Sequence, residues 1–169
     1  MTAHHLTTRP ATLADASAMA DIYNEGIADR VATFETTPRT AEQLSGWFDG
    51  RHPVVVVIDD AGQVAGYAAT FSYADRCCYA GIAEFSVYVR RSSRGQGAGA
   101  VAMKALIEAA TGAGFWKLLS RVFVENKASL ALLRSAGFRE VGVHEKHGKL
   151  DGVWRDVVAV ERILEVNLD

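Results

Sequence analysis

The chain lacks any long apolar run, and its first ten residues lack the apolar core of a secretory signal. A helix that spans a bilayer needs about 20 predominantly apolar residues. No stretch of this sequence approaches that length. A signal peptide needs a shorter apolar segment behind a basic start, which the sequence MTAHHLTTRP does not provide. We therefore expect a cytoplasmic protein with no membrane association.

Cysteine is scarce, and the only two thiols, Cys77 and Cys78, are adjacent. Adjacent cysteines rarely meet the geometry of an ordinary disulfide. Neither belongs to a metal-ligand spacing, and His144 and His147 have no third ligand nearby in the sequence. The sequence thus predicts two reduced thiols and no bound metal.

No charge of one sign is in excess, because the formal net charge is −2 at pH 7. With no extended basic stripe, the composition argues against a nucleic-acid partner. A chain of 169 residues is long enough to bury a substantial core in one domain. We expect a single domain over residues 1–169.

Hydrophobic periodicity and turn residues predict a mixed α/β domain. Thr12 and Thr40 mark two helix starts, and Gly114 and Gly137 mark two helix ends. The expected elements are a strand at 6–9, helices at 13–28 and 40–48, strands at 54–58, 63–72 and 84–89, a helix at about 100–113, a strand at 117–124, a helix at 126–136, and strands at 138–145 and 153–163. This order, β-α-α-β-β-β-α-β-α-β-β, is typical of one central twisted mixed sheet of about seven strands flanked by helices.

The stretch Glu84–Gly99, EFSVYVRRSSRGQGAG, carries the strongest functional signal. A strand passes through a basic turn into glycines and then into a helix. The first turn of a helix has N–H groups without intrahelical acceptors, its dipole favours negative charge, and glycines let an oxygen approach the main chain. Arg94 adds a guanidinium that can fork onto phosphate oxygens. The pattern predicts a site for a pyrophosphate.

Two nucleotide cofactors match these glycines. Read from Gly95, the pattern is the dinucleotide fingerprint G-x-G-x-x-A; read from Arg94, it is R-x-x-G-x-G, the acetyl-coenzyme A loop of GNAT acetyltransferases. The dinucleotide fingerprint normally opens a long doubly wound sheet and has an acidic residue about 20 residues further on. Here the glycines lie past mid-chain, and Leu118–Ser120 stand at the later position. The position of the glycines in the chain favours acetyl-coenzyme A (acetyl-CoA), and a nicotinamide-dependent oxidoreductase stays a distant alternative.

The whole chain resembles the GNAT superfamily, and more closely its branch of phosphinothricin, methionine-sulfoximine and arsinothricin N-acetyltransferases. The resemblance rests on groups of residues that follow one another in order and spacing. These are Tyr23-Asn24 with Thr33-Phe34-Glu35-Thr36, Arg76 with Tyr79 and Glu84, Val87-Tyr88-Val89 leading to Arg94–Gly99, Asn126 and Ser129 leading to Ala136-Gly137-Phe138, and the tail Gly152–Val157. The resemblance implies the GNAT fold, N-acetyltransferase activity with acetyl-CoA as cosubstrate, and a homodimer.

The resemblance also implies which residues hold the cofactor. The set is Val87, Tyr88, Val89, Arg94, Gly95, Gln96, Gly97, Ala98, Gly99, Asn126 and Ser129. A main-chain N–H of Val87 or Tyr88 would polarise the thioester carbonyl. Asn126 would bond the pantetheine arm, although an asparagine here equally suits a helix N-cap.

Glu84 is the candidate general base, as is the corresponding glutamate of the resembled family. Acetyl transfer needs a neutral amine and a route for its proton. The apolar neighbours Ile82, Ala83 and Phe85 would desolvate the carboxyl group and make it a better base. The ordinary alternative is a solvated carboxylate on a strand face.

Arg76 is the candidate ligand of the acceptor, since the resembled branch places an arginine at this offset on the substrate carboxylate. A guanidinium fits a carboxylate in bidentate fashion and would orient an amino acid with its amine toward the base. Thr33, Phe34 and Tyr73 are candidates for the side-chain end of the pocket, and Phe34 equally suits a core anchor. The expected reaction is direct attack in a ternary complex on a small amino acid or glutamate analogue, for resistance or detoxification.

Leu133 departs from the family pattern. Many GNAT enzymes carry a tyrosine general acid at this position, and the resembled branch usually has a histidine. A leucine cannot protonate a leaving thiolate, so water, Tyr88 or His147 would do so, or the thiolate would leave unprotonated. An acyl-enzyme is less favoured, because no cysteine is placed with a base, although Cys77 and Cys78 lie close to Arg76.

Two other functions stay open. Glu25, Asp29 and Glu35 would suit a cationic acceptor such as a polyamine, an aminoglycoside or a protein N-terminus. Leu133 would suit a non-catalytic acyl-CoA sensor.

Overall fold

The computed structural model of the chain describes residues 5–169, and its strands form one seven-stranded sheet. The strands are β1 (Thr7–Pro10), β2 (Val54–Ile58), β3 (Val64–Ser72), β4 (Ile82–Val89), β5 (Lys117–Phe123), β6 (Arg139–Leu150) and β7 (Val153–Ile163). Their order across the sheet is β1-β2-β3-β4-β5-β7-β6. All neighbours run antiparallel except β4 and β5, which are parallel. The predicted mixed sheet and the order of elements along the chain are confirmed.

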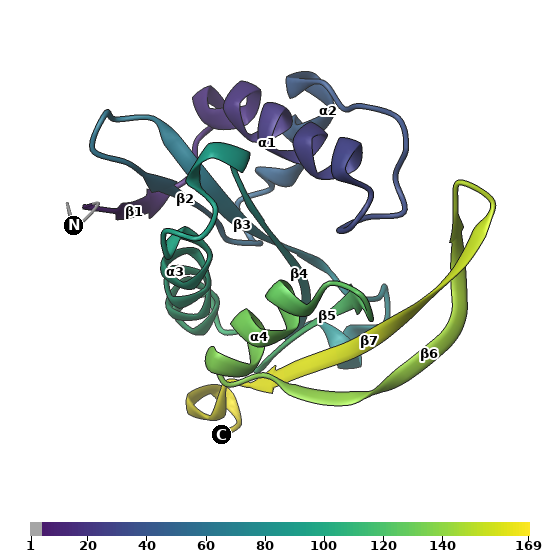
Figure 1. Ribbon diagram of the computed structural model, residues 1–169. Helices are drawn as coiled ribbons and strands as arrows, with labels where there is room; N and C mark the ends of the chain where they lie inside the picture. Colours follow the sequence, from purple (N-terminus) through teal and green to yellow (C-terminus); the bar gives the residue numbers. More distant parts are fainter. Residues whose placement is uncertain (1–4) are drawn as a thin grey trace.

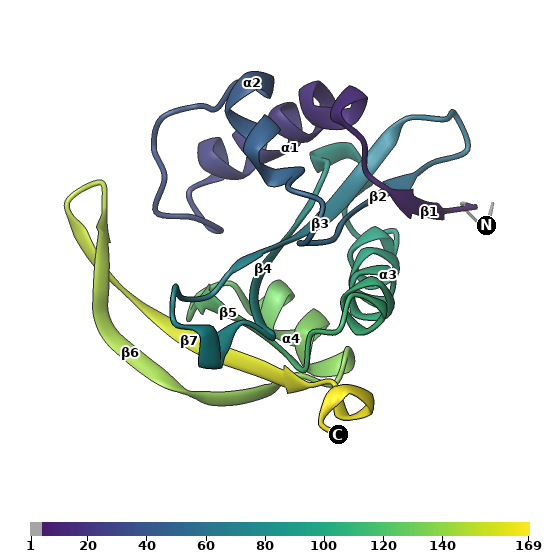
Figure 2. The ribbon, with the colours of Figure 1, turned by 180° about the vertical axis from the view of Figure 1, so that it is seen from behind.

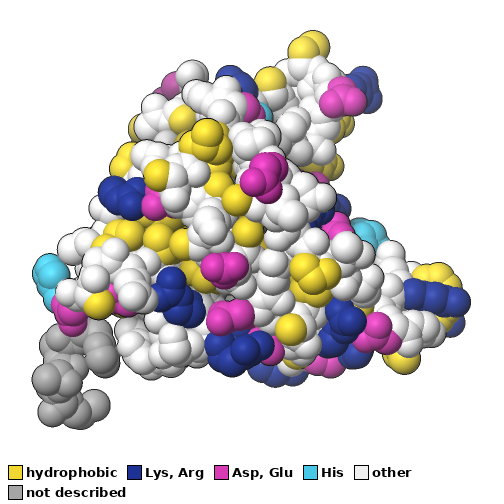
Figure 3. Space-filling view, turned by 90° about the horizontal axis from the view of Figure 1, so that it is seen from above, with side chains coloured by type: hydrophobic (Ala, Val, Ile, Leu, Met, Phe, Trp, Pro, Cys, Tyr) yellow, Lys and Arg dark blue, Asp and Glu magenta, His cyan; other side chains and the backbone are white. Residues whose placement is uncertain are grey.

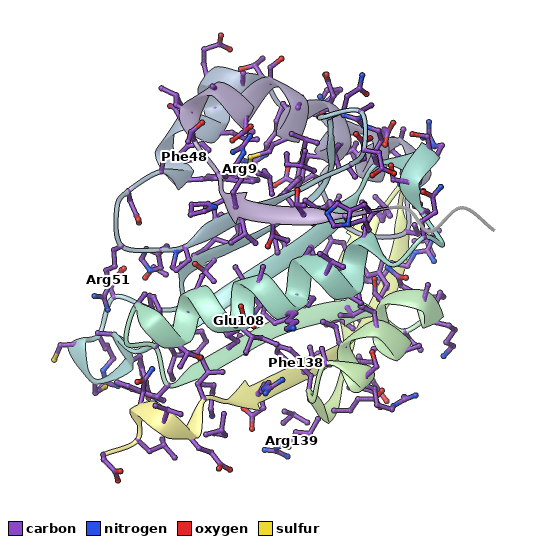
Figure 4. All side chains as sticks on the ribbon, turned by 90° about the vertical axis from the view of Figure 1, so that its left-hand side faces the viewer. Arg9, Phe48, Arg51, Glu108, Phe138 and Arg139 are labelled. Carbon is purple, nitrogen blue, oxygen red and sulfur yellow. The ribbon has the colours of Figure 1, made fainter. Side chains whose placement is uncertain are left out.

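Helices cover both faces of the sheet (Figures 1 and 2). α1 (Ala16–Asp29) and α2 (Ala41–Leu44) lie on one face, and α3 (Ala98–Gly112) and α4 (Lys127–Ser135) lie on the other. Figure 4 looks onto α3, which lies over the sheet in that view. Short 3₁₀ turns occur at Leu13–Asp15, Ser45–Trp47, Cys77–Tyr79, Arg91–Ser93 and Glu165–Asn167. Within residues 5–169, no helix has both the length and the apolar character needed to cross a membrane.

The valine run of β2 shows why the sheet needs helices on both sides. β2 lies between β1 and β3, and its side chains alternate between two cores. Val55 and Val57 pack in the core under α3, whereas Val54 and Val56 pack in the core under α1. A strand that is buried on both faces is apolar at every position, which is the pattern the sequence shows.

The predicted turn and cap residues behave as expected. Thr40 and Gln43 form a reciprocal capping box, in which each backbone N–H donates to the other side chain. Gly114 and Gly137 follow α3 and α4 with φ of +86° each. Asp151 and Gly152 also have positive φ, at +49° and +78°, in the two-residue turn between β6 and β7.

The element boundaries differ most in β6, which extends to Leu150 instead of the expected residue 145. β6 is the edge strand, and its pairing with β7 shifts register between Glu140 and Gly142 and again between His144 and Gly148. Irregular pairing and exposed polar side chains hide the strand from a periodicity argument. The hairpin of β6 and β7 extends beyond the other strands and curves back toward the end of α1 (Figure 1), where Asp151 forms an ion pair with Arg30 at 3.0 Å.

Two expected helices are also shorter than predicted. The helix expected at 13–28 begins as a 3₁₀ turn and is α-helical only from Ala16. The helix expected at 40–48 is α-helical only over Ala41–Leu44 and continues as a 3₁₀ turn.

Candidate active site

β4 and β5 pair over only three residues and then separate. The parallel pairs are Ile82 with Lys117, Ala83 with Leu118 and Glu84 with Leu119. Beyond this point β4 keeps its pairing with β3, and β5 keeps its pairing with β7. Within residues 5–169, the main chain of β4 beyond Glu84 therefore has no strand partner on its β5 side.

The register of β3 and β4 decides which amides face this opening. Arg90 N donates to Ala65 O at 2.8 Å, and these two residues lie directly opposite each other when the β3–β4 register is continued. Antiparallel ladders alternate, so the N–H of Tyr88 points toward β3 and the N–H of Val87 points toward β5. Of the two candidates for polarising a thioester carbonyl, the register favours Val87. The role itself stays a prediction.

The glycine loop presents bare amides at the start of α3. Gly95 and Gly97 have φ of +73° and +87°, and Gly97 is the N-cap of the helix. Over residues 5–169, no protein acceptor takes a hydrogen bond from the backbone N–H groups of residues 95–100. A Cβ added at Gly95 or Gly97 would meet no atom within 4 Å. The loop is thus open to an anion, and these features fit a diphosphate.

Two arginines of the basic turn are held by α1. The Asp29 carboxylate accepts from Arg91 Nη2 at 2.7 Å and from Arg94 Nη1 at 2.6 Å. These two guanidinium hydrogen bonds, the one from Arg91 first, hold the pKa of Asp29 below its usual range. Glu25 Oε2 accepts from the Arg91 N–H at 2.6 Å. The last turns of α1 therefore fix the turn that precedes the glycine loop, a role for Asp29 that the sequence pattern did not indicate.

Glu84 lies at the point where the strands separate, but its surroundings differ from the expectation. Its neighbours Ala83 and Phe85 pack into the core under α3, on the opposite face of β4, because side chains alternate along a strand. The Glu84 side chain is 29% exposed, and its Oε1 accepts from Arg121 Nη2 at 2.8 Å. Ala83 and Phe85 therefore do not surround the carboxylate, which is partly exposed and forms an ion pair. Arg121 is a residue that the sequence argument missed, although an arginine in the mostly apolar β5 was a signal.

The candidate acceptor residues come from two loops. Arg76 starts the 3₁₀ turn before β4, and its Cζ lies 5.8 Å from the centre of the Tyr79 ring. Tyr73 meets the same ring edge to face, with 5.7 Å between the centroids. Phe34, from the loop after α1, packs edge to face on Phe123 at 4.8 Å. Phe34 is thus a core anchor, and its contact with a substrate stays a prediction.

Thr33 and Tyr88 approach each other on the α1 side of the sheet. Burial raises the pKa of Tyr88 well above its ordinary value, and nearby Tyr23 adds to that rise, while a hydrogen bond with the Thr33 side chain opposes it. Tyr88 lies four residues beyond Glu84 on β4, so both side chains are on one face. His147, the other possible proton donor, stacks on His144 in the β6–β7 hairpin, with 4.8 Å between ring centroids.

Asn126 is the N-cap of α4, as its residue type suggested. Its Oδ1 accepts from the Ser129 N–H at 3.2 Å, and its Nδ2 donates to Val31 O at 3.1 Å. A contact of Asn126 or Ser129 with pantetheine stays a prediction. Leu133, one turn further along α4, is 2% exposed and packs in the core under α3. The position at which the resemblance implies a general acid is therefore occupied by a core side chain.

The three carboxylates that suggested a cationic acceptor are engaged within the chain. Glu25 and Asp29 bind the basic turn, and Glu35 Oε1 accepts from Arg39 Nη2 at 2.9 Å. Acidic and basic side chains are intermingled on the face that Figure 3 shows. These contacts weaken the argument for a polyamine or aminoglycoside acceptor.

Together, a glycine loop at a helix N-terminus and two separating parallel strands define a protein that binds an acyl-CoA and presents its acyl group to an acceptor. Residues 19–138 match the model of the acetyltransferase (GNAT) family. This chain belongs to the GNAT family and is an acetyl-CoA-dependent N-acetyltransferase.

Named relatives cover nearly the whole chain. It is 33% identical to an L-methionine sulfoximine/L-methionine sulfone acetyltransferase of Pseudomonas paraeruginosa, over 95% of this chain and 94% of that protein. It is 30% identical to the phosphinothricin N-acetyltransferase of Streptomyces coelicolor, over 92% of this chain and 95% of that protein. The crystal structure of a phosphinothricin acetyltransferase from Sinorhizobium meliloti in complex with acetyl-CoA superposes with a TM-score of 0.87 at 31% identity, covering 94% of this chain and 88% of that chain.

Proposed function

We propose that the acceptor is the amino group of a small amino acid or glutamate analogue, such as phosphinothricin, methionine sulfoximine or arsinothricin. The observation that carries the proposal is the position of Glu84, which lies where β4 and β5 separate with a guanidinium at 2.8 Å. Two named relatives acetylate amino-acid-like compounds of this kind. N-acetylation removes the positive charge of an amine, so the reaction suits resistance or detoxification.

The proposed mechanism is direct attack in a ternary complex. Acetyl-CoA supplies the activated acetyl group. Glu84 accepts the proton that the amine loses, the Val87 N–H polarises the carbonyl, and Arg76 binds the acceptor carboxylate. The Tyr88 hydroxyl is a poor proton donor, since burial raises its pKa well above its ordinary value. We therefore assign the proton of the leaving thiolate to solvent.

A groove between α3 and α4 suits the nucleotide end of the cosubstrate. Its volume is about 520 Å³, and it is lined by Ala100, Lys104, Leu132 and Ser135 among others. Ala100 belongs to the bare first turn of α3, so the groove continues from the glycine loop. Lys104 supplies a positive charge one turn further along the helix.

We also propose a cytoplasmic homodimer that forms through the β6–β7 hairpin. Val141 and Val143 on the edge strand are 52% and 55% exposed, and Val153 and Trp154 on β7 are exposed as well. Exposed apolar side chains clustered on an edge hairpin offer a surface on which a second chain can pack. Size-exclusion chromatography with light scattering tests the dimer, and a monomeric mass at micromolar concentration would reject it.

An acceptor screen with purified enzyme and acetyl-CoA tests the function. The panel holds phosphinothricin, methionine sulfoximine, arsinothricin, the common amino acids and spermidine, with free thiol as the readout. We expect turnover of amino-acid-like acceptors and a kcat for Glu84→Gln that is lower by about 10²–10⁴-fold. A preference for spermidine would reject the amino-acid acceptor in favour of a polyamine. Binding of acetyl-CoA without turnover of any amine would indicate a non-catalytic sensor.

A further inference from the structure

Arg121 forms an ion pair that bridges the opening between the two parallel strands. It lies two residues beyond Leu119, the last residue of β5 that pairs with β4, and on the same face. Its Nη2 donates to Glu84 Oε1 at 2.8 Å. The pair thus joins the two edges of the opening at the position where the acceptor amine must meet Glu84.

Both partners retain free capacity. Within residues 5–169, the Glu84 contact is the only hydrogen bond of the Arg121 guanidinium, and Glu84 Oε2 has no partner. Arg121 is 42% exposed and Glu84 is 29% exposed, so the free groups face solvent side by side. A guanidinium has five N–H donors and a carboxylate has two oxygens, so each can bind a second partner.

Stability alone does not explain an arginine here. Exposed ion pairs contribute about 0–1 kcal/mol. Leu119 and Phe123, the neighbours of Arg121 on this face of β5, are both apolar. A charged side chain between them suits a polar ligand better than it suits core packing.

An α-amino acid carries the complementary pair of charges, since its ammonium and its carboxylate are joined through one carbon. When the ammonium of such a molecule binds Glu84 Oε2, its carboxylate is close enough to reach the N–H groups of Arg121 that have no other partner. We infer that Arg121 and Glu84 together recognise the acceptor as an α-amino-acid zwitterion, with Arg121 as a second carboxylate ligand beside Arg76. This inference deepens the proposed function and rests on it. A carboxylate has about four acceptor positions, so two arginines can share it.

Paired acceptors test the inference. For Arg121→Ala and Arg121→Gln, kcat and KM are measured with the best amino acid from the screen and with its decarboxylated amine. We expect KM for the amino acid to rise at least tenfold, with kcat/KM for the decarboxylated amine changing less than threefold. Arg76→Ala, measured in parallel, reports the share of the other arginine. The acetyl-CoA affinity of each variant, measured by calorimetry, should match the wild type and shows that the variant is folded.

Lys117→Ala is the matched control. Lys117 also lies on β5 and forms an ion pair, with Glu161 at 3.1 Å, but it is at the far end of the strand from the opening. The Lys117→Ala variant should have the same KM as the wild type for both acceptors. Equal losses with both acceptors would make Arg121 a positioning residue for Glu84 and overturn the inference, as would an unchanged KM for the amino acid. A wild-type enzyme that prefers the decarboxylated amine would reject the proposed function as well.

Discussion

Gly97→Ala is a direct test of the glycine loop, because the substitution strains the backbone without a clash. Gly97 has φ +87° and ψ 0° at the N-cap of α3, and a Cβ there would meet no atom within 4 Å. A residue with a side chain loses about 1–2 kcal/mol in the left-handed region. Lower freedom of the unfolded chain offsets about 0.4–1 kcal/mol of that loss. We expect Gly97→Ala to lower the free energy of unfolding by about 1 kcal/mol, or Tm by about 2–4 °C.

Gly112→Ala is the matched control at the other end of the same helix. Gly112 has no positive φ, and a Cβ there also meets open space. Alanine is the better helix former by up to about 1 kcal/mol, so this substitution should raise stability. Urea denaturation followed by circular dichroism should therefore show the two variants shifting in opposite directions at a common m-value.

The same variants test where the diphosphate binds. The Cβ of Gly97→Ala would occupy open space at the loop where the diphosphate is proposed to bind, so the Kd for acetyl-CoA should rise about tenfold, equivalent to about 1.4 kcal/mol. Gly112→Ala should leave Kd unchanged in calorimetry. If Gly97→Ala were as stable as the wild type, the strain argument would be refuted. If its Kd were unchanged, the placement of the diphosphate would be refuted.

Three further substitutions test single contacts. Tyr67 is fully buried and its hydroxyl has no partner within residues 5–169, so Tyr67→Phe should stabilise the protein by about 1 kcal/mol in urea denaturation. A loss of stability there would show that the hydroxyl has a partner. Asp15, whose side chain is 8% exposed, binds both terminal nitrogens of Arg9 (labelled in Figure 4) at 2.8 Å, which holds its pKa below the usual range. The stabilisation that the Asp15 carboxylate contributes is therefore present above the unfolded pKa of about 3.9 and lost as pH falls through the lower folded pKa. Asp15→Asn should be less stable than the wild type by about 2 kcal/mol at pH 6, and this difference should close below about pH 4. A stability difference that is the same at pH 6 and pH 2 would contradict this assignment. Tyr88→Phe should keep kcat, measured in the thiol-release assay, within about threefold of the wild type, because the proposed mechanism assigns the general-acid role to solvent. A loss of about 10²-fold or more would show that the Tyr88 hydroxyl is the general acid.

Local signals in the sequence were sufficient for much of the fold. The capping box of Thr40, the glycines after α3 and α4 and the turn at Asp151 and Gly152 depend on residues within one or two turns of each other. The predicted bounds of β2 and β7 match the structure. Turn residues stand on both sides of β2, and Asp151 and Gly152 stand directly before β7. The glycine loop was found for the same reason, since its chemistry lies within one short stretch.

Contacts between distant residues were not predictable in this way. Glu84 and Arg121 are 37 residues apart, and their ion pair depends on the parallel register of β4 and β5, for which no local residue is diagnostic. The hold of Asp29 on Arg91 and Arg94 spans more than 60 residues. Along the chain Glu84 stands between Ala83 and Phe85, whereas alternation sends these two side chains to the other face. In each case the missing information is tertiary, and the site combines it with the local signals.

β4 and β5 can separate because each is paired with another strand. This separation also explains how the site can tolerate a leucine at position 133. Each strand keeps an antiparallel neighbour along its length, β3 for β4 and β7 for β5, so the two can part without either losing its place in the sheet. Parting leaves the Val87 amide without a strand acceptor, and an amide left unpaired away from water is costly unless a ligand or solvent binds it. Backbone register, rather than side-chain identity, thus leaves this amide free for the role that the proposed mechanism gives it. In the proposed mechanism, a leucine at position 133 leaves this amide and Glu84 in place, so the missing side-chain acid bears on the departure of the thiolate and not on the attack of the amine.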